Sequence, residues 1–321
     1  AARAEVSQVR AELAALTARL QDEVVDLCID LRNALTLLGE SERTLAHLRR
    51  AEVVAERVDD QRRLGRVLSF KANCLFLLGQ HESAIDAGRR ALGIAAALDD
   101  AALRTATEQY VGRAHQALGH YRRAIEIFGG IVRSLTGDLA RSHFGLPVIP
   151  AVFSRSHLAV CLAEVGAFDE ATRHAQEATQ IADETAHPDT PLWAHRGSGL
   201  VHLARGEGAS AARALERALT LCHVYNMPTY TARINSELAL ARAMSGHVTE
   251  ALALGDQALQ NAQATNLSEI ELNRGEVYLL FSRLPEAEAP AARALALFRG
   301  QRERGNEAHA LRLLADVLWR R

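Results

Sequence analysis

The sequence predicts an all-α fold, a right-handed solenoid of about seven helix hairpins with capping helices. Glycines, most of them preceded by an apolar or small residue, recur mostly every 40 residues along the 321-residue chain. Small residues stand at fixed distances from these glycines. The stretches between them are rich in Ala, Leu, Arg and Glu at helical spacing, and a lone hairpin of such helices cannot bury its apolar side. Successive hairpins must therefore stack.

Six glycines and one serine mark the repeat, at intervals of 40, 40, 47, 40, 40 and 36 residues. The markers are Gly39, Gly79, Gly119, Gly166, Gly206, Gly246 and Ser282. Glycine reaches the left-handed conformation that ends many helices without the steric cost of a β-carbon. Each marker thus predicts the end of a first helix (helix A) and the turn into a second helix (helix B) of the same hairpin.

Three columns of mostly small residues keep the register of the markers. Seven residues before the markers stand Arg32, Ala72, Gly112, Ala159, Gly199, Ala239 and Gly275. Five residues after them stand Thr44, Ala84, Ala124, Ala171, Ala211, Ala251 and Ala287. Twelve residues after them stand Ala51, Ala91, Ile131, Ala178, Ala218, Ala258 and Ala294. Small side chains at these places let helix A and helix B of one hairpin approach closely, with their ridges interlocked.

The elements follow one another along a single continuous solenoid. In chain order they are an N-terminal capping helix (residues 1–20), units one to three (21–142), a proline-containing apolar insertion (143–150), units four to seven (151–300) and a C-terminal helix (301–321). The final interval of 36 residues predicts that helix A of unit seven is about four residues short.

The insertion accounts for the long interval of 47 residues. Pro147 and Pro150 cannot continue a helix and bias the residues before them toward extended backbone. We therefore expect helix B of unit three to end near residues 138–142 and helix A of unit four to begin near Ala151. Two interpretations stay open. The favoured one is a loop that packs its apolar residues against the neighbouring repeats, and the other is an internal ligand mimic in the groove. The apolar residues in question are Phe144, Leu146 and Ile149.

The unit resembles the tetratricopeptide repeat. Ala72, Ala84 and Ala91 flank the marker of unit two as small residues flank the inter-helix turn in that family. Tyr121 and Phe168 stand two residues after their markers, where the family has an aromatic residue. The 40-residue period exceeds the usual period of about 34 and implies longer helices. In that family helix A lines the concave surface, where partner peptides usually bind.

Four stretches carry a second resemblance, which covers roughly residues 25–318. They are "DLRNALTLLGE", "ALGHYRRAIEIF", "FGLPVIPAVFSRSHLAVCLAEVGAFDEA" and "RERGNEAHALRLLADV". Together they are similar to the C-terminal repeat region of bacterial signalling proteins that carry a class III adenylate/guanylate cyclase domain and an AAA-type ATPase module before their tetratricopeptide repeats. The resemblance implies a regulatory role toward such attached domains.

Residues nine, six and three before each marker are expected to face the groove. In the first three units Asn33, Asn73 and Arg113 then form a polar line one repeat apart. Asn amides can pair with a peptide backbone, and Arg113 can hold a carboxylate. The candidate groove residues are Asn33, Arg66, Phe70, Asn73, Gln109, Tyr110, Arg113, Gln116 and His157. Units five to seven are expected to place more apolar residues inward, namely Leu200, Leu203, Leu240, Met244 and Leu279.

Composition argues against several function classes. A formal charge of −2 and a mixed distribution of Arg with Glu and Asp disfavour nucleic acid as a partner. Four dispersed cysteines predict packed, reduced thiols in the cytoplasm, and no apolar run is long enough to span a membrane. The only lysine, Lys71, lies outside any phosphate-binding loop motif. His157 and Cys161 lie one helical turn apart, and we interpret them as packing residues rather than as metal ligands.

The sequence therefore predicts a non-catalytic interaction module without a metal or cofactor. Its expected partner is a protein or peptide in the concave groove, and its expected role is to regulate attached cyclase or ATPase domains. The alternative is a stand-alone receptor for a short signalling peptide that controls transcription.

Overall fold

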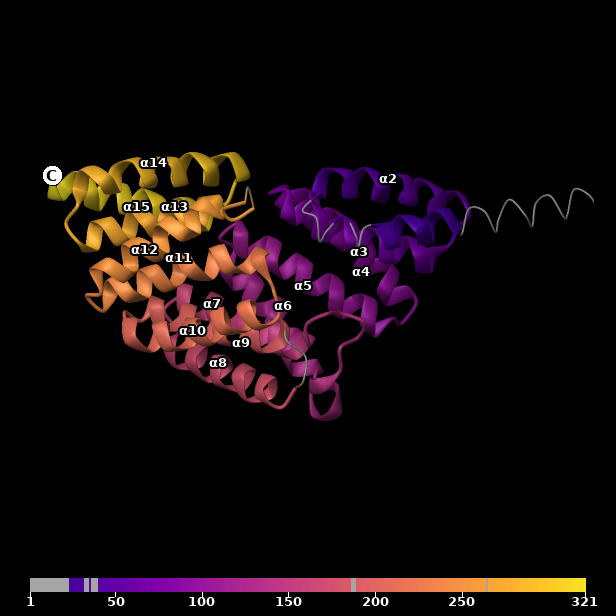
Figure 1. Cartoon of the computed structure of the whole chain (residues 1–321). Helices are drawn as coiled ribbons and strands as arrows, with labels where there is room; N and C mark the ends of the chain where they lie inside the picture. The colour runs from indigo at the N-terminus through magenta and orange to yellow at the C-terminus, as the bar shows by residue number, and fades with distance from the viewer. Residues whose placement is uncertain (1–22, 32–34, 36–39, 186–188, 264) are drawn as a thin grey trace, which may run out of the picture. The chain divides into compact units, whose positions relative to one another are not determined.

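The computed structural model describes residues 23–31, 35, 40–185, 189–263 and 265–321 (Figure 1). Throughout these residues the secondary structure is helical, without a strand. The A helices are residues 23–31, α3 (Gln61–Leu77), α5 (Ala101–Ala117), α7 (Pro150–Glu164), α9 (Asp189–Ala204), α11 (Pro228–Met244) and α13 (Leu267–Leu280). The B helices are α2 (Ser41–Arg57), α4 (His81–Ala97), α6 (Tyr121–Ser134), α8 (Phe168–Asp183), α10 (Gly208–Val224), α12 (Val248–Gln260) and α14 (Leu284–Gln301). A 3-10 helix, η1 (Gly137–Arg141), and the terminal α15 (Arg304–Arg320) complete the fold.

The chain divides into two compact units, each made of several repeats. The first unit is Ala1–Val111, the second unit is Gly112–Arg321, and the boundary falls within α5. From here on, "first unit" and "second unit" mean these two parts, whereas the repeats keep the numbers one to seven. In the first unit α3 packs against α2 and α4. In the second unit, from α6 to α15, each helix packs against the next helix along the chain, and α7 packs against α9 as α11 packs against α13. Contact with sequence neighbours is the pattern of a solenoid, so the predicted fold class is confirmed. In the described part of the chain, no helix is both long and apolar enough to cross a membrane.

The markers adopt the predicted left-handed backbone. Their φ values are +71° for Gly79, +74° for Gly119, +80° for Gly166, +77° for Gly206, +81° for Gly246 and +55° for Ser282. Gly39 lies outside the described residues. A second left-handed position, which the sequence analysis missed, ends B helices about 20 residues later, at Asp59, Asp99, Asn226 and Arg302. Asp and Asn tolerate this conformation better than most residues.

The three columns of mostly small residues lie where helix A of a hairpin packs against helix B. Every described member of the three columns is buried. A β-carbon on Gly199 would come within 2.6 Å of Cγ of Leu215, and one on Gly112 within 2.7 Å of Cζ of Phe128. The predicted close approach of the two helices in each hairpin is therefore confirmed.

The insertion departs from its predicted boundaries. Helix α6 ends at Ser134, not near residues 138–142. The cause is local, because Thr136 is extended and Gly137 has a φ of +57°. The 3-10 helix η1 fills the predicted end of the helix, and α7 then begins at Pro150.

The apolar residues of the insertion pack against the second unit. Ile149 is 1% exposed, and its N–H donates to Oγ1 of Thr190 at 3.2 Å. Phe144 packs against the apolar cluster that contains Phe128, and Val148 packs against the cluster that contains Trp193. Leu146 is half-buried. These contacts favour the interpretation of the insertion as a packed loop.

We predict that Gly199→Ala lowers the free energy of unfolding by about 1–3 kcal/mol, because the new methyl group collides with a fully buried leucine that cannot move aside. Gly93, on the exposed side of α4, has no atom within 4 Å of the corresponding position. The control Gly93→Ala should therefore raise the stability by about 0.5–1 kcal/mol. Urea unfolding followed by circular dichroism measures both. Equal effects would mean that the hairpins are not tightly packed.

Candidate functional site

Side chains of successive A helices contact one another across each repeat boundary of the second unit. Gln116 pairs with His157, Phe153 with Trp193, Trp193 with Tyr230, Arg196 with Glu237, Ser236 with Asn273, and Arg233 with Glu269. We call this set the A-helix ladder. It links α5, α7, α9, α11 and α13 in order. Polar and aromatic side chains therefore join the repeats along the A helices of the second unit.

His157 lies at the centre of an aromatic cluster. Its ring stacks on Phe128 at a centroid distance of 5.3 Å, with 18° between the planes. The rings of Phe153 and Trp193 lie 4.4 Å and 5.7 Å from it. Phe153 and His157 are four residues apart, so both project from the same side of α7. Trp193 also meets the Tyr230 ring edge-on at 5.7 Å.

The hydrogen bond of His157 assigns its tautomer. Nδ1 lies 2.8 Å from Oε1 of Gln116, and we assign the proton to Nδ1 because an amide oxygen only accepts. Burial lowers the pKa of His157 well below its usual value, and the guanidinium groups of Arg113, Arg196 and Arg233 lower it further. The imidazole is therefore neutral, and Nε2 carries a lone pair.

Nε2 of His157 is a buried acceptor without a hydrogen-bond partner in the described structure. Leaving such a group unsatisfied costs about 1–3 kcal/mol. Native proteins keep few such groups, and each one calls for an explanation such as a bound ligand. Nδ1 of His174 and Oδ1 of Asn235 also lack a hydrogen-bond partner in the described part of the second unit, but the His157 atom belongs to a ring surrounded by three other aromatic rings, and we therefore take it as the indication of a binding site.

Two arginines of the site lie over aromatic rings. The guanidinium carbon of Arg113 is 5.8 Å from the centroid of Phe153, and that of Arg196 is 5.6 Å from the centroid of Trp193. Both distances suit cation–π attraction. The cluster thus combines flat apolar surfaces with positive charge.

Arg196 and Glu237 form a buried, two-pronged ion pair between α9 and α11. Nε of Arg196 donates to the two carboxylate oxygens at 3.0 and 3.1 Å, and a second guanidinium nitrogen donates at 2.5 Å. Glu237 is 4% exposed. Burial raises the pKa of the Glu237 carboxyl, and the Arg196 guanidinium opposes that rise. Each charge depends on the other because neither is solvated.

The structure brings together some of the predicted groove residues. Gln116 and His157 are in contact, and Arg113 lies over the ring that adjoins His157. In the first unit Arg66 is exposed, Phe70, Asn73 and Tyr110 are half-buried, and Gln109 is buried. Asn33 lies outside the described residues. The polar line from Asn33 through Asn73 to Arg113 crosses the unit boundary within α5, so that line as one site stays a prediction.

The sequence analysis missed most of the A-helix ladder. Phe153, Trp193 and Arg233 each stand thirteen residues before a marker, the position that singled out Arg66 in unit two. Comparing the residue thirteen positions before the marker across all the repeats would have identified them.

The expected inward apolar residues of the later repeats are half-buried or buried, namely Leu200, Leu203, Leu240, Met244 and Leu279. The same helices also carry the buried charges of Arg196 and Glu237.

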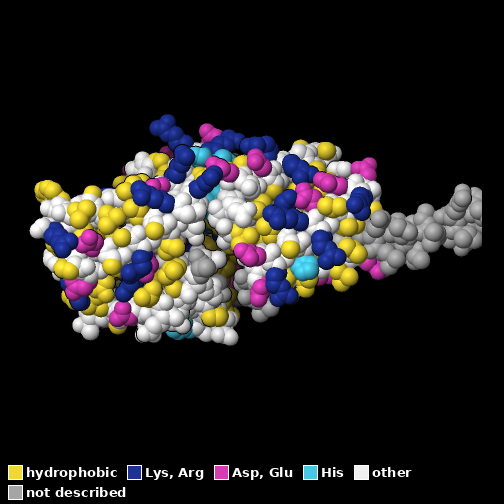
Figure 2. Space-filling view, turned by 90° about the horizontal axis from the view of Figure 1, so that it is seen from above, with side chains coloured by type: hydrophobic (Ala, Val, Ile, Leu, Met, Phe, Trp, Pro, Cys, Tyr) yellow, Lys and Arg dark blue, Asp and Glu magenta, His cyan; other side chains and the backbone are white. Residues whose placement is uncertain are grey.

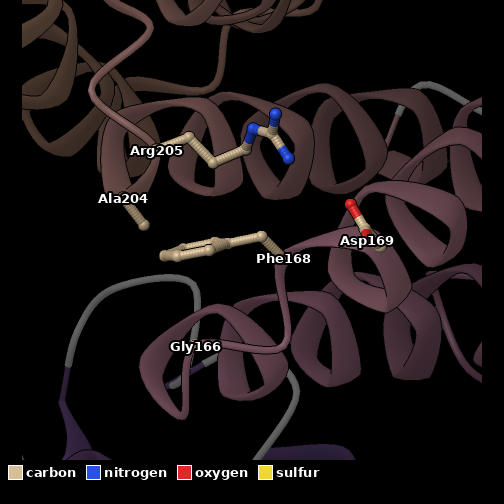
Figure 3. Close-up of a pocket in the computed structure, with 5 residues that line it drawn as sticks. All are labelled: Gly166, Phe168, Asp169, Ala204 and Arg205. Atoms are coloured by element: carbon tan, nitrogen blue, oxygen red, sulfur yellow. The ribbon is translucent and has the colours of Figure 1, made fainter.

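Two hollows of the second unit lie away from the ladder. One, of about 410 Å³, is lined by Gly166, Phe168, Asp169, Ala204 and Arg205, and Figure 3 shows the Phe168 ring pointing toward Ala204. The other, of about 590 Å³, lies among α8, α9 and α10. Figure 2 shows basic and acidic side chains interspersed over the visible face, as the sequence predicts.

Cys28, Cys74, Cys161 and Cys222 are buried free thiols, as expected. The described residues contain no group of three or more His, Cys, Asp or Glu side chains that could hold a metal ion.

Comparison with known proteins supports the fold. No protein-family model matches the chain, and no curated protein matches it in sequence. A Rap protein in complex with competence and sporulation factor is similar in structure, with a TM-score of 0.58 at 14% identity over 94% of this chain and 98% of that chain. The Rap conjugation gene regulator of plasmid pLS20, in complex with the Phr* peptide, gives 0.56 at 11% identity over 94% of each chain. A tetratricopeptide repeat protein from Parabacteroides merdae gives 0.55 at 11% identity over 92% of this chain and 99% of that chain. At these identities the likeness shows the fold, a solenoid of tetratricopeptide-like repeats.

We predict that Glu237→Gln lowers the free energy of unfolding by about 3–5 kcal/mol, because it leaves the buried Arg196 guanidinium without the carboxylate that it is hydrogen-bonded to. The matched control is Asp86→Asn in the exposed Asp86–Arg89 pair, which should change stability by less than about 1 kcal/mol. Chemical unfolding at neutral pH measures both. Equal, small effects would mean that water reaches Arg196.

We predict that His157 reduces stability as the pH falls. Because its pKa is lowered in the folded state, the unfolded chain binds the proton first, and stability falls by up to about 1.4 kcal/mol per pH unit below about pH 6.5. His157→Asn should remove this part of the pH dependence, since an Asn amide can still donate to Gln116. The exposed His223→Asn is the control. Unfolding curves of all three proteins from about pH 7 to pH 5 test the prediction. An unchanged slope in His157→Asn would contradict it.

Proposed function

We propose that the second unit is a peptide-binding regulatory module and that its A-helix ladder recognises an extended segment of a partner. The observation that carries the proposal is the buried lone pair of His157 Nε2. A backbone N–H of a peptide is the commonest donor that could satisfy this acceptor.

The surroundings of His157 suit such a ligand. Phe153, Trp193 and Tyr230 offer aromatic surfaces for an apolar side chain of the peptide. Arg113 adds a positive charge that favours an acidic group nearby. Because Nε2 is buried, binding requires the A helices to separate locally, so the ligand would select an opened form of the unit.

The structural comparisons support a peptide ligand without establishing one. Two of the similar structures are Rap proteins in complex with competence and sporulation factor or with the Phr* peptide. Their likeness to this chain is one of fold, and the site residues of this chain are argued from its own contacts.

Two settings suit a module of this kind. In one, it regulates a cyclase or ATPase domain attached to it, as the resemblance of residues 25–318 implies. In the other, it is a stand-alone cytoplasmic receptor for a short signalling peptide that controls transcription. In both settings the repeats themselves are non-catalytic. Partner-dependent nucleotide turnover by the full-length gene product, but not by residues 1–321, would favour the first setting.

We predict that a random peptide library displayed on phage yields binders to residues 1–321 and that His157→Asn weakens the selected peptide about 10- to 100-fold, the cost of one lost buried hydrogen bond. Fluorescence anisotropy of the labelled peptide measures the affinity. His223→Asn, the same change at an exposed histidine of helix α10, should leave the affinity unchanged.

A third variant, Arg66→Ala/Asn73→Ala, tests the groove predicted for the first three repeats without touching Arg113 of the ladder site. Loss of binding in this variant alone would place the site along that groove. Equal binding by the wild type and His157→Asn would refute the role of the ladder, and the absence of any selected peptide would refute the proposed function.

A further inference from the structure

The first turn and the last helix of the second unit touch, although they lie far apart in the sequence. Gly119 lies in the turn after α5, and Gly305 is the second residue of α15. A β-carbon on Gly119 would lie 2.9 Å from the backbone nitrogen of Gly305, and one on Gly305 would collide with the hydroxyl oxygen of Tyr121. Two backbones and a tyrosine are therefore packed together with no room for another side chain. We call this contact, together with the His309–Glu164 pair described next, the seam.

A polar pair completes the seam. Nε2 of His309, on α15, lies 3.0 Å from a carboxylate oxygen of Glu164 at the end of α7. This hydrogen bond raises the pKa of His309, and burial and Arg312 offset the rise in part. Glu276 of α13 also faces His309, but its carboxylate is held by Arg312. Burial, with help from Glu164, raises the pKa of Tyr121, so the phenol stays protonated.

The seam is an exception to the rule that a solenoid unit contacts only its neighbours. Helix α15 packs against α13 and α14, as expected for the end of the array (Figure 1). The apolar clusters that include residues of α15 draw their other described members from α13 and α14, not from α5, α6 or α7. The described contacts of the seam are those of the two glycines, Tyr121 and one polar pair, and no apolar cluster of described residues joins its two sides, so we expect it to open more easily than the hairpins themselves.

We propose that the seam is a releasable latch that closes the second unit, and that the His309–Glu164 pair makes its closure depend on pH. Protonated His309 binds the carboxylate and holds the latch shut at low pH. As the pH rises through the pKa of His309, the charge and the attraction are lost, so the open form gains population. The consequence for ligand access to His157 rests on the proposed function, whereas the opening itself does not.

Spin labels across the seam measure the opening directly. The labels replace the exposed residues Arg122 on α6 and Ala308 on α15, as Arg122→Cys and Ala308→Cys. The four native cysteines are buried, so they should stay unlabelled, which labelling of the parent chain checks. Electron–electron distance measurements at about pH 6 and pH 8.5 bracket the ordinary histidine pKa.

We expect one short distance at low pH and a two- to fivefold rise in the open fraction at high pH, roughly the effect of one partly exposed ion pair. His309→Arg keeps the charge and should stay closed at both pH values. His309→Leu should be equally open at both. Gly305→Val, which wedges the seam, should give long distances even at low pH, provided that circular dichroism shows intact helices.

Three results would overturn the latch. They are a pH-independent distribution in the parent chain, an unchanged pH response in His309→Arg, and a short distance retained in a folded Gly305→Val. No ligand enters the measurement, so failure of the peptide selection would refute the proposed function and leave this test intact.

Discussion

Close approach of the two helices within each hairpin is the constraint on which the rest of the structure depends. At Gly112 and Gly199 the facing helix occupies the space that a β-carbon would need, and the alanines of the other columns are fully buried. Interdigitated helices of this kind resist deformation because interiors are close-packed. Each hairpin is therefore rigid, and any change in the shape of the solenoid must occur at the boundaries between hairpins.

Those boundaries are held by different chemistry. Within hairpins the contacts set a small residue against an apolar side chain, as in Gly112 with Phe128 and Gly199 with Leu215. Between A helices they include long polar and aromatic side chains, such as Arg196 with Glu237 and Trp193 with Tyr230. A buried ion pair adds little net stability, because desolvation offsets most of the attraction, but it has a strong geometric preference. The A-helix ladder therefore determines the relative orientation of neighbouring hairpins more than it adds to the stability of the contact between them.

The sequence revealed what is local and periodic. Left-handed caps and close helix crossings impose steric demands on single positions, so Gly79, Gly119 and the buried columns could be predicted without a structure. The end of α6 at Ser134 could not, because it depends on the extended backbone of Thr136 beside an unremarkable sequence. His157 was expected in the groove, but its partner Gln116 stands at a different place in the preceding repeat, and periodicity does not pair unlike positions. The contact of Gly119 with Gly305 joins repeats that are far apart in the sequence, and the periodic pattern of residues does not indicate it.

The buried acceptor and the weak seam make physical sense together. A ligand that needs His157 Nε2 binds only the fraction of molecules whose A helices have separated, so its apparent affinity falls by that fraction. A seam held by an apolar core would make the open fraction negligible, and a ligand of ordinary affinity could not reach the site. The described seam of the second unit is instead small, and the attraction within its polar pair depends on whether His309 is protonated. A change of one proton can then alter the open fraction severalfold, which is the range in which a receptor can be tuned without losing its ligand altogether.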